Sequence, residues 1–266
     1  MLEAILLIEE LHGKISPSGS NLTDRLEDKL TGDFFGTLRY LPFEVGLKPI
    51  LLATLLQEDH SSAAKDFLQL LDQVKGYEYD FNFWVRSEYG EIDATLETEK
   101  LFIGLEMKYR SGLSSDDEVD NSLLELEERE QSINQLSRYS EYLKTVAEGK
   151  EKFLLFVAPV SKGVIVVENV HSRNLIHKPI TLGLLSWETI YEVLEKMDCS
   201  HMEPYQKFII SDLTDLLIKK GFQTFNGFTG LEEYQITDQG YIFSGEEELI
   251  SWPMATVKGD LIYGFR

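Results

Sequence analysis

The sequence predicts a mixed α/β fold: a mixed central sheet flanked by helices, with extra helices at the N-terminus and a C-terminal α+β extension. Two observations carry this prediction. At Tyr77 the apolar period changes from about 3.6 residues to strict alternation, and the predicted elements run helices, hairpin strands, helix, strands, helices. The chain has 266 residues, 43% of them hydrophobic, which is enough for a sizeable core.

Residues 1–21 predict an amphipathic helix followed by a turn-rich connector, GKISPSGSN. Glu3, Glu9 and Glu10 interrupt the apolar run, and no basic segment or cleavage site accompanies it, so it fits neither a signal peptide nor a membrane span. The single cysteine, Cys199, suits a reducing compartment. We therefore expect a cytoplasmic protein with no membrane partner.

Residues 22–180 predict the core. Apolar residues at helical spacing predict a helix from Leu22 to Leu41, ended by Pro42, and a second helix over 45–56. Alternation predicts strands over 77–86, 90–98 and 101–110, the last two joined at Glu99-Lys100. An acid-rich loop then leads to a helix over 123–146, and apolar runs predict strands over 152–160 and 163–170.

Residues 181–266 predict a C-terminal extension packed on the core. Helices are expected over 187–197 and 205–220. The last forty residues contain short strand-like runs rich in glycine and aromatic residues.

The hairpin over 90–110 carries the chemistry. A two-residue turn at Glu99-Lys100 pairs Thr98 with Leu101, and this register places Asp93 opposite Glu106 and Glu91 opposite Lys108. Alternation then puts two sets on opposite faces: the polar set Asp93, Thr95, Glu106 and Lys108, and a core set of Ile92, Ala94, Leu96, Leu105 and Met107.

Two carboxylates on adjacent strands, with Cβ atoms about 5 Å apart, repel each other unless a cation lies between them. Hard oxygen ligands suit Mg²⁺ or Mn²⁺. Lys108, two residues after Glu106, would stabilise charge on a phosphate or orient and deprotonate a water. The alternative is a solvated hairpin face with an ordinary Glu–Lys pair.

Further motifs accompany the hairpin: LEDKLTGDFFGTLRYLP before it, and EMKYRSG and INQLSRY within and after it. Together they resemble the PD-(D/E)XK nuclease superfamily, over roughly residues 22–170, and a poorly characterised bacterial nuclease-like branch of it. The resemblance implies a restriction-endonuclease-like core. Ile92 replaces the family's proline, at a position where the superfamily varies.

The resemblance also implies roles for individual residues. Glu27, Asp93, Glu106 and the carbonyl of Met107 would hold Mg²⁺ or Mn²⁺, although Asp24 and Asp28 are also candidates for the first-helix acid. Lys108 and Gln135 would complete the catalytic set. Substrate would contact residues of the following helix, Gln135, Arg138 and Tyr139.

These residues predict a metal-dependent nuclease that hydrolyses phosphodiester bonds of DNA or, as the alternative, of RNA. The net charge of −21 argues against wrapping nucleic acid over the whole surface. A local basic stretch over 138–178, with seven Lys/Arg and four Glu, is the candidate binding surface. A homodimer would suit cleavage of both strands of a duplex. The alternative is an inactive nuclease-fold protein that binds protein or nucleic acid, in defence or DNA processing.

A different enzyme is the weaker rival. Cys199 and His201 lie close in sequence, but no accompanying thiol-enzyme motif supports them. The sequence contains no HExxH zinc motif, phosphate-binding P-loop or G-x-S-x-G elbow.

Overall fold

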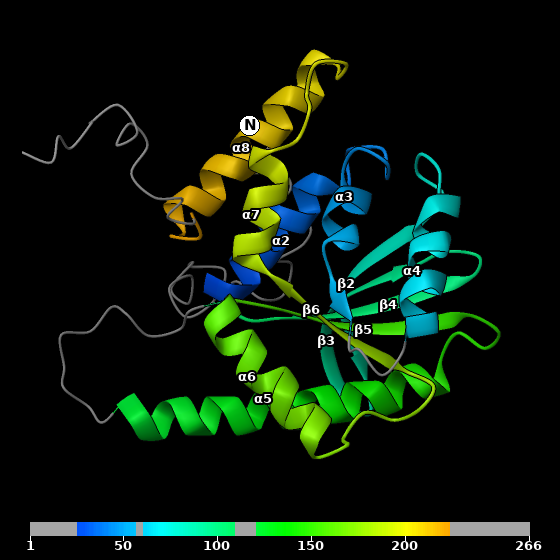
Figure 1. Cartoon of the computed structure of the whole chain (residues 1–266), viewed down its shortest axis with the longest axis vertical. Helices are drawn as coiled ribbons and strands as arrows, with labels where there is room; N and C mark the ends of the chain where they lie inside the picture. Colours follow the sequence, from blue (N-terminus) through cyan, green and yellow to red (C-terminus); the bar gives the residue numbers. More distant parts are fainter. Residues whose placement is uncertain (1–25, 57–60, 110–120, 224–266) are drawn as a thin grey trace, which may run out of the picture. The chain divides into compact units, whose positions relative to one another are not determined.

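The computed structural model of the chain describes residues 26–56, 61–109 and 121–223 (Figure 1), all within one compact unit. Its helices are α2 (Leu26–Leu38), α3 (Leu47–Leu52), α4 (Ser61–Gln73), α5 (Asn121–Thr145), α6 (Val160–Ser172), α7 (Trp187–Glu195) and α8 (Pro204–Lys219). Its strands are β1 (Leu55–Leu56), β2 (Asp80–Ser87), β3 (Gly90–Glu97), β4 (Leu101–Met107), β5 (Glu151–Ala158) and β6 (Thr181–Ser186).

The strands form one mixed six-stranded sheet in the order β1-β6-β5-β4-β3-β2. β2, β3 and β4 make an antiparallel meander, β5 and β6 continue it in parallel, and β1 pairs antiparallel with β6. The parallel pairs need crossover connections, which α5 and α6 supply. The α/β class and the mixed sheet flanked by helices are therefore confirmed.

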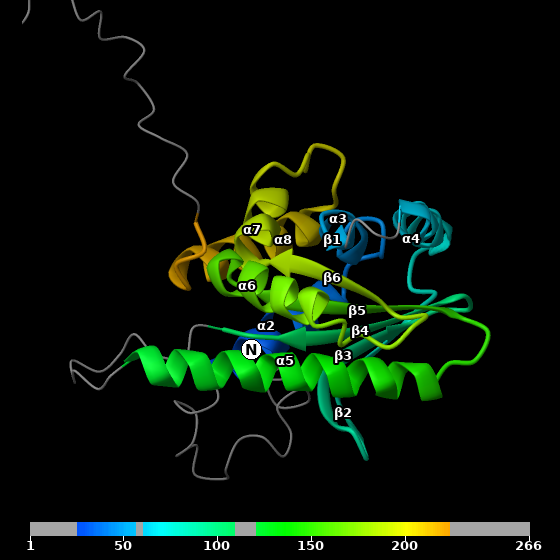
Figure 2. The same cartoon turned by 60° about the horizontal axis from the view of Figure 1, so that its bottom comes forward.

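Helices cover both faces of the sheet. α5 and α6 pack on one face through an apolar cluster that includes Leu136, Leu143 and Val166. On the other face, a larger cluster includes side chains of α2, α3, α4, α7 and α8. In Figure 1, α5 and α6 lie below α2, α7 and α8, and Figure 2 shows the long helix α5 running beside β3 and β4. The central strand β4, covered on both sides, is buried along its whole length.

The predicted hairpin has the predicted register. The amide of Thr98 donates to the carbonyl of Leu101 at 2.8 Å, and Ala94 pairs with Leu105. Turn geometry and side-chain alternation fix the same alignment, because a slip by one residue would exchange the faces of the strand.

The strand predicted over 163–170 is wrong, because this segment lies within helix α6. Gly163, Val166 and Val170 are buried at helical spacing, whereas Val164 and Ile165 are exposed. The missing side chain of Gly163 lets the helix approach β6, since a Cβ there would lie 2.4 Å from Cδ1 of Leu184. Packing of one helical face thus overrides the β-propensity of a valine-rich run.

The sheet also continues past residue 180, the predicted end of the core, because Thr181–Ser186 adds the parallel strand β6. The helix expected over 45–56 is shorter, as α3, and its C-terminal end becomes the edge strand β1. Helix α4, over Ser61–Gln73, was missed.

Other expectations fall outside the described residues: the N-terminal helix and connector, the first part of the acidic loop, and the short strands of the last forty residues. Within the described part of the chain, no helix combines the length and hydropathy needed to cross a bilayer.

Gly183, at the centre of β6, gives a test of the packing. A Cβ there would lie 2.6 Å from Cγ2 of Thr54, 2.8 Å from Cδ2 of Leu56 and 2.9 Å from Cδ2 of Leu155. Because three side chains must move at once, Gly183→Ala is expected to lower the free energy of unfolding by about 1–3 kcal/mol. Urea denaturation measures it, with exposed Leu55→Ala as a control expected within about 0.5 kcal/mol of wild type.

Candidate functional site

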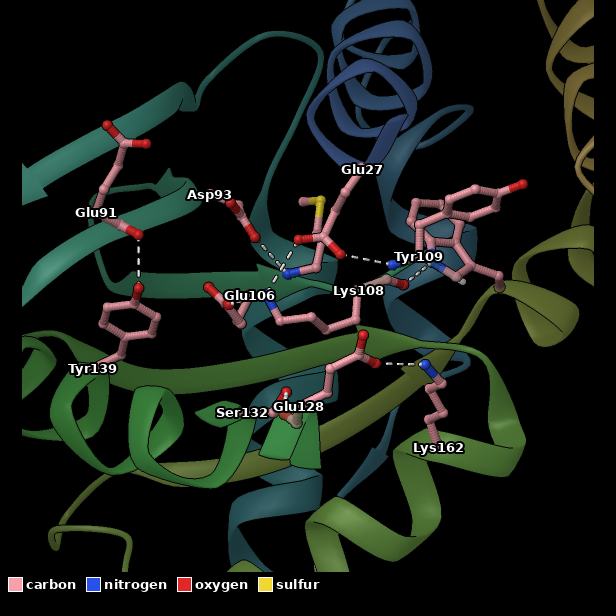
Figure 3. A network of polar contacts seen from close by, with 12 residues as sticks. Glu27, Glu91, Asp93, Glu106, Lys108, Tyr109, Glu128, Ser132, Tyr139 and Lys162 are labelled. Carbon is pink, nitrogen blue, oxygen red and sulfur yellow. Dashed lines mark hydrogen bonds and ion pairs between the residues drawn. The ribbon is translucent and has the colours of Figure 1, made fainter. Parts of the chain in front are cut away.

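The candidate site lies where β4 ends. Glu106 is the penultimate residue of β4 and Lys108 follows the strand, while Glu27 lies in the first turn of α2. Asp93 comes from the neighbouring strand β3. The fold thus brings together four predicted residues, which Figure 3 shows around the end of β4.

The Lys108 ammonium lies among the carboxylates. Its Nζ is 2.8 Å from Oε1 of Glu106 and 3.2 Å from Oε1 of Glu27. The second oxygen of Glu27 accepts a hydrogen bond of 2.9 Å from the amide of Tyr109 (Figure 3). Glu106 is only 1% exposed, whereas the side chains of Lys108 and Glu27 are 23% and 33% exposed. The cluster therefore runs from a buried acid to a partly open edge.

Asp93 accepts a hydrogen bond of 2.7 Å from the backbone amide of Met107 through Oδ2. The described ladder between β3 and β4 ends at the pair Ala94–Leu105, one pair before Asp93 and Glu106. A side chain of β3 therefore takes over a backbone donor of β4, and this ties Asp93 to the strand that carries Glu106.

Two details of the predicted faces are wrong. Ile92 packs in the α5–α6 cluster, not beside Ala94, because the regular alternation of β3 breaks at Asp93. Glu91 does not face Lys108 but forms an ion pair with Arg86 at 2.6 Å. The described pairing of β4 with β3 does not extend to Lys108, whose backbone N–H donates to the carbonyl of Val157 in β5 at 2.7 Å.

The charged groups of the cluster shift one another's pKa values. Burial, and then the charge of Glu106, raise the pKa of Asp93 well above its usual value. Burial also raises the pKa of Glu106, although Lys108 opposes this. For Lys108, burial alone lowers the pKa, but Glu106, Glu27 and Asp93 outweigh it and raise the pKa above its ordinary value. The three carboxylates therefore hold the lysine as an ammonium.

The carboxylates of the cluster offer oxygen donors to a divalent cation. Oε2 of Glu106 is buried and has no hydrogen-bond partner among the described residues. A buried, unpartnered carboxylate oxygen next to a second carboxylate suits a hard cation such as Mg²⁺ or Mn²⁺. As they stand, however, no three His, Cys, Asp or Glu side chains of the described segments are grouped to hold a metal. The ammonium of Lys108 supplies positive charge there instead.

Of the three predicted residues of α5, Tyr139 and the side-chain oxygen of Gln135 are buried, whereas Arg138 is exposed. Tyr139 is buried, and its hydroxyl donates to the carbonyl of Glu91 at 2.7 Å, so it anchors β3 to α5 (Figure 3). Oε1 of Gln135 is buried with no hydrogen-bond partner in the described part of the chain. Arg138 is exposed. The contacts described for the cluster of acids and Lys108 do not include Arg138.

Sequence reasoning missed two groups that support the site. The indole N–H of Trp187 donates to the carbonyl of Lys108 at 2.9 Å, and the amide of Tyr109 binds Glu27. Trp187 begins α7, directly after β6, and no pattern in the sequence links it to the hairpin. A further ion pair, Lys162 with Glu128 at 3.1 Å, joins α6 to α5 (Figure 3).

The basic stretch over 138–178 is less open than its composition suggests. Lys150 pairs with Glu97, Lys162 with Glu128 and Arg173 with Glu130. Acids from other parts of the chain thus neutralise three of its seven Lys and Arg residues. Composition alone therefore overstates the positive charge available to a polyanion.

Comparison of the chain with protein-family models, with curated proteins and with solved structures found no match. The residue pattern and the geometry of the cluster are therefore what support a function.

Replacing Asp93 tests the electrostatics of the cluster. Because the pKa of this carboxyl is raised in the folded state, its favourable contribution to stability exists at low pH and is lost as the pH rises through the folded pKa. At pH 7 and without metal, Asp93→Asn is expected to raise the free energy of unfolding by about 1 kcal/mol. Thermal unfolding in EDTA measures this. A fall in stability would contradict it, and exposed Asp66→Asn should change little.

Proposed function

We propose that the chain is a metal-dependent nuclease with a restriction-endonuclease-like core that hydrolyses phosphodiester bonds of DNA or RNA. The observation that carries the proposal is the convergence of Asp93, Glu106 and Lys108 at the end of β4, where Oε2 of Glu106 is buried and has no hydrogen-bond partner in the described part of the chain. Folding alone does not require two acids and a lysine at the end of a buried strand, and burying them is costly.

Asp93 and Glu106, with the carbonyl of Met107, would hold Mg²⁺ or Mn²⁺. A cation bound there supplies Lewis-acid polarisation of the phosphodiester and activation of a water molecule. Glu106 is fixed by its burial, and Asp93 by its bond to the Met107 amide, so these two side chains present their oxygens in set positions.

Lys108 serves as a cationic donor. Because the surrounding carboxylates raise its pKa, it remains an ammonium at neutral pH and does not take a proton from water. Its partly exposed side chain can donate hydrogen bonds to a phosphate oxygen and stabilise the negative charge that develops there. This refines the sequence-based expectation, which also allowed it to deprotonate a water.

One observation favours the second candidate, a nuclease-fold protein that binds but does not cut. Lys108 already compensates Glu106 and Glu27, as a purely structural ion-pair cluster would. Such a protein would bind nucleic acid or protein without turnover.

Cleavage of labelled single- and double-stranded DNA and RNA, with EDTA, Mg²⁺ or Mn²⁺, tests the proposal. We expect at least one substrate to be cut only with metal, and Glu106→Gln to abolish the reaction. Glu97→Gln is the matched control, since Glu97 also pairs with a lysine, Lys150, at 2.6 Å and belongs to β3. Metal binding without cleavage of any substrate would favour the second candidate. Cleavage that persists in EDTA, or in Glu106→Gln, would overturn the assignment.

A further inference from the structure

Glu27 differs from the other two acids of the cluster in how its oxygens are used. Oε1 contacts the ammonium of Lys108 at 3.2 Å, and Oε2 accepts from the amide of Tyr109 at 2.9 Å. Both contacts reach the segment that follows β4, more than eighty residues away in sequence. Glu27 therefore ties the start of α2 to this segment.

Asp93 and Glu106 are placed differently. Asp93 binds the amide of Met107 through one oxygen, and Glu106 is 1% exposed with Oε2 unpartnered in the described structure. Glu27, by contrast, is one-third exposed, and each of its oxygens has a donor. The coordination capacity of the cluster is thus concentrated on β3 and β4.

We infer that Glu27 is a positioning residue: it holds the Lys108 ammonium and the Tyr109 amide in place and is not a ligand of the metal. This inference rests on the proposed function and changes one of its parts, because the family resemblance counts Glu27 among the metal ligands. Removal of Glu27 should leave Lys108 with only its contact to Glu106 among the acids of the cluster, and should leave the ligands on β3 and β4 intact.

The geometry also explains why a carboxylate is suited to this position. Its two oxygens accept from two donors on consecutive residues, one a side chain and one a backbone amide. A neutral glutamine retains one acceptor oxygen and loses the charge that holds the ammonium. An aspartate retains the charge, but its side chain is one methylene shorter, so the carboxylate lies farther from both donors.

Lysine acylation of the full-length protein, followed by mass spectrometry, tests the positioning role without metal or substrate. Glu27→Gln is expected to raise the labelling rate of Lys108 about fivefold, the effect of losing a partly exposed ion pair worth about 1 kcal/mol. The rate at Lys150 should not change in this variant. In Glu97→Gln the labelling rate should rise at Lys150 and stay unchanged at Lys108, because Glu97 is the partner of Lys150. An unchanged rate at Lys108 would overturn the inference.

Mn²⁺ titration followed by electron paramagnetic resonance tests whether Glu27 lies outside the ligand set of the metal. Glu27→Gln should change the affinity by less than about threefold, as expected for a partly exposed charge outside the ligand set. Glu27→Gln should lower kcat about 10–100-fold with little effect on KM, the usual effect of removing a group outside the ligand set, and Glu106→Gln, as the loss of a ligand, should weaken Mn²⁺ binding by more than about 100-fold. Equal losses of affinity in both variants would make Glu27 a ligand and overturn the inference.

The two measurements keep this inference separate from the nuclease proposal. If the wild type binds no Mn²⁺ and cuts nothing, the nuclease proposal fails, while the labelling result still decides whether Glu27 positions Lys108. Glu27→Asp, with the charge retained, covers the case in which Glu27→Gln does not fold, and it should give intermediate labelling of Lys108.

Discussion

Lys108→Met is expected to lower the rate of phosphodiester hydrolysis by about 10²–10³-fold, the usual effect of removing one donor that stabilises developing negative charge. Lys108 is the cation that contacts both Glu106 and Glu27 in the cluster. Methionine has a side chain of similar length without the charge. Single-turnover kinetics at saturating Mg²⁺ measure the loss, with Lys150→Met as the control because Lys150 pairs with Glu97 away from the cluster.

Lys108→Met should also increase the stabilisation of the protein by a bound metal ion. Without Lys108, the buried carboxylate of Glu106 loses its compensating charge, so the metal-free protein becomes less stable. Added Mn²⁺ should then raise the melting temperature more in this variant than in the wild type. Asp93→Asn, which removes a negative charge, should instead stabilise the metal-free protein and lose the response to Mn²⁺. If both variants changed the stability of the metal-free protein in the same direction, this account of the cluster would be contradicted.

Trp187→Ala is expected to lower the free energy of unfolding by about 3–5 kcal/mol. The side chain is 1% exposed, stacks on Phe222 with ring centroids 5.7 Å apart and meets the edge of Phe34 at 5.6 Å. Removing it leaves a cavity between α2, α7 and the segment after α8. Urea denaturation measures the loss, and Phe208→Ala, at a residue that is 70% exposed, should stay within about 0.5 kcal/mol of the wild type.

Trp187→Phe separates the packing of this side chain from its hydrogen bond. Phenylalanine retains most of the ring contacts but cannot donate to the carbonyl of Lys108. We expect a loss of about 1–3 kcal/mol, because a buried carbonyl is left without its donor. A variant as stable as the wild type would show that the indole N–H does not stabilise the segment after β4.

The hairpin and its acids could be predicted because the signals are local. A two-residue turn sets the pairing of Thr98 with Leu101, and alternation then carries Asp93 toward Glu106. What the alternation could not predict is the break in β3 that sends Ile92 to the opposite cluster from Ala94. On the neighbouring strand, Trp84 has a positive φ of 53°, an uncommon conformation for a bulky residue that propensity does not anticipate.

The remaining parts of the site depend on tertiary packing. A family pattern in the sequence indicates Glu27, but its contacts with Lys108 and Tyr109 arise because α2 begins beside the end of β4. Trp187 reaches the site only because β6 joins the sheet in parallel and α7 starts at its end. Helix α6 shows the same limit, since the burial of Val166 and Val170, not the local preference of valine, sets its conformation.

The central claim is that Asp93 and Glu106 form a divalent-cation site at the end of β4. Mn²⁺ binding to the purified full-length protein, followed by electron paramagnetic resonance in the wild type and in Glu106→Gln, tests it most directly. The account predicts saturable binding to the wild type and a loss of more than about 100-fold in affinity in the variant, beyond the roughly 10–100-fold usual for a group outside the ligand set. Equal binding to both proteins, or none to the wild type, would contradict it and leave the cluster as a structural ion-pair network.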